Sequence, residues 1–382
     1  MNFNYVFMPI IIFMAGVFAI WLCSRRILAL SKKTYPAWRR IVEQAVLSIV
    51  ILVALAIAGY TAFNAIAVHS FWARNPAPGK LVDVDGYRMY IDCTGSGSPT
   101  LILEAGAQSD STIWNGVQPA LSKTTRVCSY DRAGFGWSDA RPTTRDADHI
   151  AAELHGLLLR ASIAGPIVLM GHSLGGIFIR DYVIHYPADV AGMVFVDSAT
   201  PFQDKNPVLV RTAQAGGHSG FSPPAWFWNV ALIVGVPRLL GMCKGDPGPD
   251  ATLNKLRAEE ICRLRIAAFS EIEDENFHLS SQQTLSPSSF GTLPILIISR
   301  DPAKSLPAKP SQAELDRRNA WGQMQDDLKN LSTRSRRITA KNSSHQVMVD
   351  RPDLIEKEVP VFIEQIRGST PQPATYGSTE TK

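Results

Sequence analysis

Hydrophobic and polar residues alternate with two different periods between residues 81 and 367. Short β-rich runs bounded by Gly, Pro and polar clusters predict strands, and longer segments with apolar residues three or four positions apart predict helices. The predicted strands are 81–85, 87–93, 100–104, 126–130, 167–170, 193–196, 295–298 and 336–338. The predicted helices are 149–159, 174–185, 311–331 and 353–366. Such alternation predicts an α/β fold with a mostly parallel sheet covered by helices on both faces.

One segment, 201–290, interrupts this alternation. It is rich in Pro, Gly and Ser and contains the apolar run 225–236, which includes Trp226 and Trp228. We expect a cap inserted between two sheet strands, whose tryptophans either pack onto the sheet or form an acyl pocket or a membrane-facing lid. The polar tail 368–382 has the composition of a disordered segment.

Two long apolar stretches, 5–23 and 45–68, precede the alternating region. Neither contains a charged residue, and each is long enough to cross a bilayer. The loop between them contains the basic residues Arg25, Arg26, Lys32, Lys33, Arg39 and Arg40. The positive-inside rule places this loop in the cytoplasm and everything after residue 70 on the other side. Residues 1–70 are therefore predicted to be a two-span anchor with the lipid bilayer as partner.

Two alternatives apply to these stretches. The first could be a cleaved signal peptide, but no basic residue precedes it. The second could be a buried core helix, but its length favours a membrane span.

Charge and motif spacing exclude several classes of protein. The net charge of +4 is small for 382 residues, and no basic stripe with interleaved aromatics is present, so nucleic acid is not an expected partner. The spacings of phosphate-binding loops, dinucleotide-binding glycines and zinc sites are absent from the sequence. No cofactor or metal is therefore expected.

The cysteines give a partial check on the side of the membrane. Cys23 lies at the membrane, whereas Cys93, Cys128, Cys243 and Cys262 fall in the part placed outside the cytoplasm. An oxidising compartment permits disulfides there. Cys93 ends one predicted strand and Cys128 lies in another, while Cys243 and Cys262 are close in sequence. We hypothesise the pairs 93–128 and 243–262, with buried free thiols as the alternative.

A candidate nucleophile follows the predicted strand 167–170. The segment Gly171-His172-Ser173-Leu174-Gly175-Gly176 fits the pattern Gly-x-Ser-x-Gly, a sharp strand-to-helix turn that exposes a serine. The pattern needs small residues because the strained turn packs the following helix tightly against the strand. Ser173 is therefore the predicted nucleophile.

A serine nucleophile needs a base, which should follow the last sheet strand. His345 lies in the polar loop after the predicted strand 336–338. The other histidines well beyond Ser173, which are His218 and His278, fall in the predicted cap. His345 is therefore the predicted base, and a solvated loop histidine is the alternative.

An acid should orient the base, and it should come before His345 in the chain. Asp301 directly follows the predicted strand 295–298 through Ser299 and Arg300. The carboxyl ends of such strands are where active sites collect. We predict Asp301 as the acid. Asp197 after the strand 193–196 and Asp316 on a helix are the alternatives.

Negative charge that develops on the substrate oxygen needs backbone donors. One predicted donor is the amide of Leu174, immediately after the nucleophile. The other is the amide of Ala107, in the loop after the strand 100–104, where Gly106 allows close approach. A simple glycine turn is the alternative interpretation of this loop.

Together these motifs resemble the α/β-hydrolase superfamily, in particular its esterase-like members with a helical cap. The resemblance spans about residues 81–367 and rests on Gly106, the segment 130–139 (YDRAGFGWSD), the elbow 171–176, Ser344-His345 and Asp350-Arg351-Pro352. It implies an eight-stranded sheet and a catalytic triad of Ser173, Asp301 and His345. It also implies that the strands of Cys93 and Cys128 are neighbours, which favours that disulfide. The chain departs from many members by having Ala105-Gly106 in place of His-Gly and a short acid motif.

The sequence thus predicts a membrane-anchored serine hydrolase that acts outside the cytoplasm. It would cleave an ester, thioester or amide of a small, apolar substrate through an acyl-enzyme on Ser173. The alternatives are a non-catalytic binding protein on a hydrolase scaffold, or carbon–carbon bond hydrolysis or cofactor-free peroxidation at the same site.

Overall fold

The computed structural model describes residues 3–30, 35–141, 143–210, 225–247, 250–304, 306–307 and 309–369. Lys32, Lys33, His218 and the predicted disordered tail from residue 370 onward lie outside the described residues, as does the side chain of Trp226. The chain divides into two compact units. The first comprises Met1–Pro76 and Ser222–Ala268, and the second comprises Ala77–Phe221 and Phe269–Lys382.

The second unit is built on a sheet with the strand order β1-β2-β4-β3-β5-β6-β7-β8. The strands are β1 (Lys80–Asp83), β2 (Arg88–Thr94), β3 (Thr100–Glu104), β4 (Val127–Tyr130), β5 (Ile167–His172), β6 (Val190–Val196), β7 (Ile295–Arg300) and β8 (Ser335–Ala340). Strand β2 pairs antiparallel with β1 and β4, and the strands from β4 to β8 pair in parallel. The predicted eight-stranded, mostly parallel α/β-hydrolase sheet is therefore confirmed.

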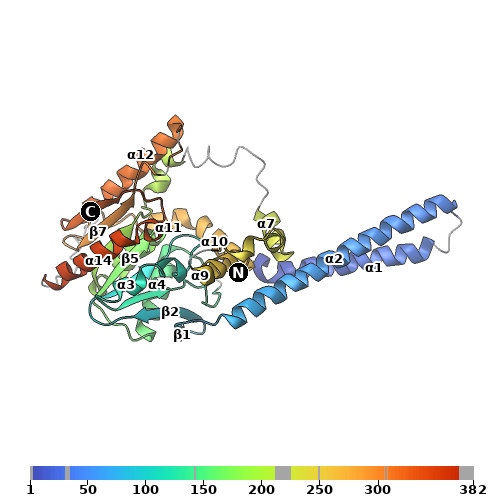
Figure 1. Ribbon diagram of the computed structural model, residues 1–382, viewed down its shortest axis with the longest axis horizontal. Helices are drawn as coiled ribbons and strands as arrows, with labels where there is room; N and C mark the ends of the chain where they lie inside the picture. Colours follow the sequence, from blue (N-terminus) through green and yellow to red (C-terminus); the bar gives the residue numbers. More distant parts are fainter. Residues whose placement is uncertain are drawn as a thin grey trace, which may run out of the picture. The chain divides into compact units, whose positions relative to one another are not determined.

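Helices cover both faces of this sheet (Figure 1). The helices of this unit are α3 (Gln118–Leu121), α4 (Ala147–Arg160), α5 (Gly175–His185), α11 (Phe277–Gln283), α12 (Gln312–Asp327), α13 (Val347–Asp350) and α14 (Pro352–Arg367). Short 3₁₀ turns lie at η1 (Ser111–Trp114), η2 (Pro187–Asp189), η3 (Gln203–Lys205) and η5 (Leu328–Leu331).

Alternation along each strand sorts its side chains between two apolar cores. In β5, Ile167 and Leu169 pack on the side of α4 and α5, whereas Val168 and Met170 pack on the side of α3 and α14. Successive side chains of a strand point to opposite faces, so a strand buried on both faces is apolar throughout. This burial explains why the central strands appear in the sequence as continuous apolar runs.

The described residues between β6 and β7 contain no strand. From residue 225 onward their elements are α7 (Ala225–Ile233), α8 (Val236–Leu239), η4 (Met242–Lys244), α9 (Ala251–Ile261), α10 (Leu264–Glu275) and α11. Most of this insertion belongs to the first unit, with the N-terminal helices, and the boundary between the units falls within α10.

Two long helices, α1 (Phe3–Leu30) and α2 (Ala37–Arg74), begin the chain and run side by side (Figure 1). Each is long and apolar enough to cross a membrane. The predicted spans 5–23 and 45–68 lie inside them. Arg26 of α1 pairs with Glu43 of α2 at 2.7 Å, so the two helices are also joined by an ion pair.

Both hypothesised disulfides are present. Cys93 and Cys128 face each other across the β2–β4 ladder and are bonded. Cys243 of η4 is bonded to Cys262, which directly follows α9. Each unit therefore contains one of these two crosslinks.

Candidate active site

The candidate nucleophile lies on a strained turn between β5 and α5. Ser173 has φ of 51°, in the left-handed region that non-glycine residues rarely adopt. Its amide donates to the Val196 carbonyl at 3.2 Å, which fixes the turn against the end of β6. A Cβ atom on Gly171 would lie 2.6 Å from the Gly175 carbonyl oxygen, so the elbow needs glycine at this position. The strain is therefore imposed by close packing on both sides of the serine.

The candidate base is paired with a buried carboxylate. Nδ1 of His345, in the loop after β8, lies 2.5 Å from Oδ2 of Asp197. The Asp197 side chain is fully buried, whereas 32% of the His345 side chain is exposed. Asp197 directly follows β6 and, with φ of 44°, also adopts a left-handed conformation. Both Ser173 and Asp197 thus lie on strained turns at the carboxyl ends of neighbouring parallel strands.

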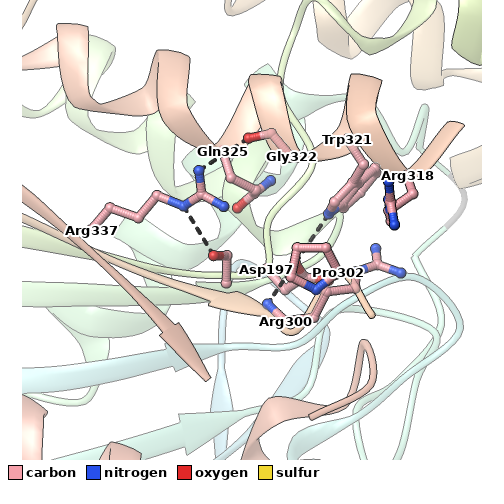
Figure 2. Close-up of a pocket in the computed structure, with 9 residues that line it drawn as sticks. Asp197, Arg300, Pro302, Arg318, Trp321, Gly322, Gln325 and Arg337 are labelled. Atoms are coloured by element: carbon pink, nitrogen blue, oxygen red, sulfur yellow. Dashed lines mark hydrogen bonds and ion pairs between the residues drawn. The ribbon is translucent and has the colours of Figure 1, made fainter. Parts of the chain in front are cut away.

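Two further residues hold the Asp197 carboxylate (Figure 2). The backbone N–H of Arg300 donates to Oδ1 at 3.1 Å, and Nε1–H of Trp321, on α12, donates to the same oxygen at 3.0 Å. The Arg300 guanidinium forms an ion pair with Oδ2 at 2.6 Å. Burial alone would raise the pKa of Asp197, but the hydrogen bond with His345 and the charge of Arg300 lower it below the ordinary value. The carboxylate therefore stays ionised beneath the imidazole.

The structure does not bring the predicted acid Asp301 into contact with His345. One Asp301 oxygen accepts the N–H of Asn342 and the other accepts the N–H of Ala303, both at 2.9 Å. These two bonds lower the pKa of Asp301, and they tie its loop to the loop after β8. Arg300, which could have paired with its neighbour Asp301, pairs with Asp197 instead.

The remaining alternative acid, Asp316, lies on α12 and accepts a hydrogen bond from Gln312 at 2.8 Å. Among the three aspartates considered from the sequence, Asp197 is thus the one in contact with His345. Trp321 and Arg300 were not identified from the sequence as partners of the acid. Arg300 offered a weak signal, because a cation directly at a strand end can neutralise a buried carboxylate nearby.

A second histidine connects the elbow with the His345 loop. The ring centroids of His172 and His345 lie 4.6 Å apart, and Nε2–H of His172 donates to the His345 carbonyl at 3.0 Å. Burial, together with the charge of His345, lowers the pKa of His172 to about 3. His172 is therefore neutral, and it can support an imidazolium at position 345 without adding a second positive charge.

The loop after β3 lies directly against the elbow. A Cβ atom on Gly106 would lie 2.9 Å from Nδ1 of His172 and 3.1 Å from Cβ of Ser173, so glycine permits this close approach. Ala107 follows Gly106 and Leu174 follows Ser173, so the two predicted amide donors come from segments that meet beside Ser173.

A buried arginine sets the orientation of that loop. Nη1 and Nη2 of Arg132 donate to the carbonyl oxygens of Ala105 and Gly106, each at 2.9 Å. Its charge is balanced by Glu104 at 2.7 Å and Glu273 at 2.8 Å, and all three side chains are about 1% exposed. In a trans peptide the N–H points opposite to the C=O. The N–H of Ala107 shares a peptide group with the Gly106 carbonyl, and it therefore points away from Arg132.

This role of Arg132 was not found from the sequence, where the residue appeared only as part of the segment 130–139. The local sequence around Arg132 does not predict which backbone carbonyls its side chain will bind. Its partner Glu273 lies 141 positions away in the chain.

One group of side chains in the described part of the chain could share a cation. Asp148, Asp181 and His185 offer ligand atoms within 4.8 Å of one another. Nε2 of His185 lies 3.1 Å from Asp148 and 3.4 Å from Asp181, as in an ordinary ion-paired cluster. We assign no ion to it.

The order of these features along the sheet defines a class of protein. A strained serine follows β5, a glycine loop follows β3, and an Asp–His pair joins the ends of β6 and β8. This is the arrangement of α/β hydrolases.

Comparisons with known proteins agree with this class. A family model described as the alpha/beta hydrolase fold matches residues 99–257. A protein of Gibberella zeae called an AB hydrolase superfamily protein is 26% identical over 294 residues, which cover 70% of this chain and 87% of that protein. A probable transporter, efuK, of Hormonema carpetanum is 36% identical over 143 residues, which cover 35% of this chain and 20% of that protein. The chain spans less than two thirds of the length of the first curated relatives that it matches, namely 20%, 55% and 39%.

Solved structures show the same fold. The crystal structure of DBJA has a TM-score of 0.57 and 18% identity, and the match covers 77% of this chain and all of that one. A serine hydrolase involved in carbazole degradation, the CarC enzyme, has a TM-score of 0.51 and 17% identity, with 75% and 98% of the two chains covered. The chain has the α/β-hydrolase fold.

Proposed function

We propose that this protein is a membrane-anchored serine hydrolase that cleaves an ester, thioester or amide through an acyl-enzyme on Ser173. The observation that carries the proposal is the 2.5 Å contact between His345 Nδ1 and the buried Asp197 carboxylate. This contact leaves Nε2 of His345 to exchange a proton with the serine. The triad in this proposal is Ser173, His345 and Asp197, with Asp197 in place of the predicted Asp301.

The steps follow from these roles. His345 takes the proton of the Ser173 hydroxyl as the oxygen attacks the carbonyl carbon, and Asp197 stabilises the imidazolium that forms. The imidazolium then protonates the leaving group, and the acyl group remains on the serine. Water, deprotonated by the same imidazole, releases the acyl group and restores the enzyme.

The charge on the substrate oxygen would be stabilised by the amides of Ala107 and Leu174. Arg132 supports this assignment because it binds the carbonyls of Ala105 and Gly106. The N–H of Ala107 then points away from Arg132, where it can donate to the substrate oxygen. We treat Arg132 as a positioning residue, since it acts through the loop rather than on the substrate.

We also propose that both N-terminal helices cross the bilayer and that the hydrolase lies on the non-cytoplasmic side. The basic residues between the helices support this topology under the positive-inside rule. The Cys93–Cys128 disulfide supports it independently, because disulfides persist in oxidising compartments. A site attached to a membrane favours an apolar ester as the substrate.

Turnover of p-nitrophenyl esters of increasing chain length by the full chain in detergent tests the proposal. We expect hydrolysis that falls by at least about a thousandfold in both Ser173→Ala and His345→Ala. A panel with an ester, an amide and a diketone separates ester cleavage from carbon–carbon bond cleavage. No turnover of any panel member by the folded protein would favour a binding protein on a hydrolase scaffold.

A further inference from the structure

Three apolar side chains are exposed together at one turn of the insertion. Leu239, at the end of α8, is 70% exposed, Leu240 is 71% exposed, and Met242, at the start of η4, is 54% exposed. We call these three residues the apolar tip. Leucine and methionine are among the residues that proteins most often bury, and exposed patches of them mark contact surfaces. The apolar tip is therefore a candidate interaction surface.

The large apolar residues exposed on the second unit are distributed differently. In the described part of that unit they are Leu81, Leu159, Phe202, Leu279, Val349 and Val361. No two of them are closer than twelve positions in the chain. Apolar side chains that are exposed singly are common and need no explanation. The apolar tip differs because its three residues lie within four consecutive positions, so the chain itself keeps them next to one another.

The backbone of the apolar tip is held by contacts within the first unit. Gly241, inside the tip, has φ of 81°, in the left-handed region that glycine adopts readily. Cys243, the first residue after the tip, is disulfide-bonded to Cys262. The carbonyl of Cys243 also accepts from Nζ of Lys255 at 2.6 Å. The tip is therefore presented by a crosslinked segment.

The segment that carries the tip is bonded to the last turns of the apolar stretch of α2. Nε of Arg238, the residue before the tip, donates to Oδ1 of Asn64 at 2.8 Å. Nδ2 of Asn64 donates to the Leu232 carbonyl at 3.2 Å, which ties α7 to the same turn. Asn64 lies four residues, or about 6 Å along the helix axis, before the end of the charge-free stretch 45–68. The segment is therefore fixed to α2 where this helix leaves the proposed membrane.

The polar groups at this contact are paired inside the unit. The side chains of Arg238 and Glu259 are 15% and 3% exposed and form an ion pair at 2.5 Å, and Asn64 is 6% exposed. Polar groups beside a bilayer are tolerated when they face one another rather than hydrocarbon. Phe63 and Ile66, next to Asn64 in α2, are 55% and 65% exposed. Both elements thus enclose their polar groups and expose apolar side chains.

We propose that the apolar tip enters the leaflet in which α2 ends and contacts the acyl chains of the lipids there. Hydrocarbon is the occupant because the exposed apolar residues of α2 near Asn64 already contact lipid under the proposed anchorage, and the tip is bonded to that turn. Lys244, exposed directly after Cys243, provides a polar boundary, since lysines beside a membrane-inserted segment reach the headgroups. The inference rests on the membrane anchorage proposed above and is independent of the hydrolase activity.

Fluorescence quenching of the full-length chain in liposomes tests this. Cys23, which is not disulfide-bonded, is changed to serine. Leu240→Cys is then labelled with the fluorophore NBD under non-reducing conditions, which preserve both disulfides. We expect quenching by a phospholipid with a nitroxide on its acyl chain, and little quenching by iodide in the water. The same label at Asp246→Cys, an exposed position beyond Lys244, should show the opposite pattern.

A second comparison examines whether the two leucines hold the tip in the leaflet. With the label at Met242→Cys, the double substitution Leu239→Gln and Leu240→Gln should lower quenching by the nitroxide lipid about threefold or more, because amide groups are costly to place in hydrocarbon. Leu159→Gln is the matched control, because Leu159 is 63% exposed and belongs to the second unit. This control should leave the quenching unchanged. Circular dichroism checks that both variants fold.

The outcomes separate this inference from the others. Quenching at Leu240→Cys by iodide and not by the lipid, in a chain that resists extraction by alkaline carbonate, overturns the inference and leaves the anchorage in place. Extraction of the chain by carbonate overturns the anchorage and the inference together. Quenching by neither agent shows that protein covers the tip, which also overturns the inference, and crosslinking between two Leu240→Cys chains would identify that protein as a second copy. Ser173→Ala should change none of these results.

Discussion

Strands β6 and β7 are neighbours in the sheet and each is followed by an aspartate, but the two aspartates differ completely in environment. Asp197 after β6 is fully buried and contacts His345, Arg300 and Trp321. Asp301 after β7 accepts two backbone N–H groups of surface loops. Position at the carboxyl end of a parallel strand is therefore not sufficient to make a carboxylate part of the site. Whether a carboxylate becomes part of the site depends on the partners that other elements supply.

A buried cation beside the end of β3 likewise depends on partners from several elements. Arg132 is buried between Glu104 and Glu273, and it binds the carbonyls of the loop that follows β3. At both buried strand ends, a charged group is retained because several partners from distant parts of the chain satisfy it. The surface aspartate after β7 needs no such partners.

The largest expected effect concerns the two aspartates directly. Asp197→Asn keeps the shape of the side chain but removes the negative charge under His345, so kcat/KM for an activated ester should fall about 10³–10⁴-fold. Asp301→Asn is the matched control, and its kcat/KM should stay within about threefold of the native value. If Asp301→Asn causes the larger loss, the assignment of the acid is reversed.

The next effect concerns Arg132. Arg132→Gln leaves Glu104 and Glu273 buried without their cation, so the free energy of unfolding in urea should fall by about 3–5 kcal/mol. Because that variant could unfold, Arg132→Lys provides the second measurement. A lysine keeps the charge but cannot bind both carbonyls, so kcat should fall about 10–100-fold with KM nearly unchanged. A KM effect of the same size with kcat unchanged would contradict a role in orienting the loop amide.

A smaller effect is expected at Trp321. Trp321→Phe removes one donor to Asp197, but it keeps a ring beneath the Arg300 guanidinium, which lies 4.6 Å from the present ring. We expect a loss of kcat of about tenfold or less, since His345 and Arg300 still hold the carboxylate. A loss as large as that of Asp197→Asn would mean that Trp321 touches the substrate.

The smallest effect is a pH dependence of stability. The pKa of Asp197 is lowered in the folded chain, so its ion pairs stabilise the protein fully above the ordinary carboxyl range and are lost as the pH falls through that lowered value. The difference in unfolding free energy between the native protein and Asp197→Asn should therefore be constant from about pH 5 to 8 and shrink below about pH 4. A difference that grows on acidification would contradict an ionised Asp197.

The contrast between the two aspartates also explains what the sequence could predict. Local signals placed the strands, the Ser173 elbow and His345, because hydrophobic period and glycine spacing are encoded within a few residues. The choice between Asp197 and Asp301 depends on Arg300, Trp321 and the His345 loop, which come from three separate elements. No local sequence pattern indicates which carboxylate these three groups will contact.

The same limit applies to the N-terminal helices. The apolar composition of α2 predicted a span that ends near residue 68, whereas the helix continues to Arg74. In this extension of α2, the Trp72 ring contacts the Arg263 guanidinium from the insertion. That contact joins residues 191 positions apart, so composition alone could not indicate it.

Mapping the adduct of a fluorophosphonate probe on the full chain tests the central claim most directly. These probes modify a serine only when a base has activated it. We predict a single adduct on the peptide that contains Ser173, formed far more slowly in Asp197→Asn than in Asp301→Asn. An adduct on another serine, or no adduct on the folded native protein, would contradict the account.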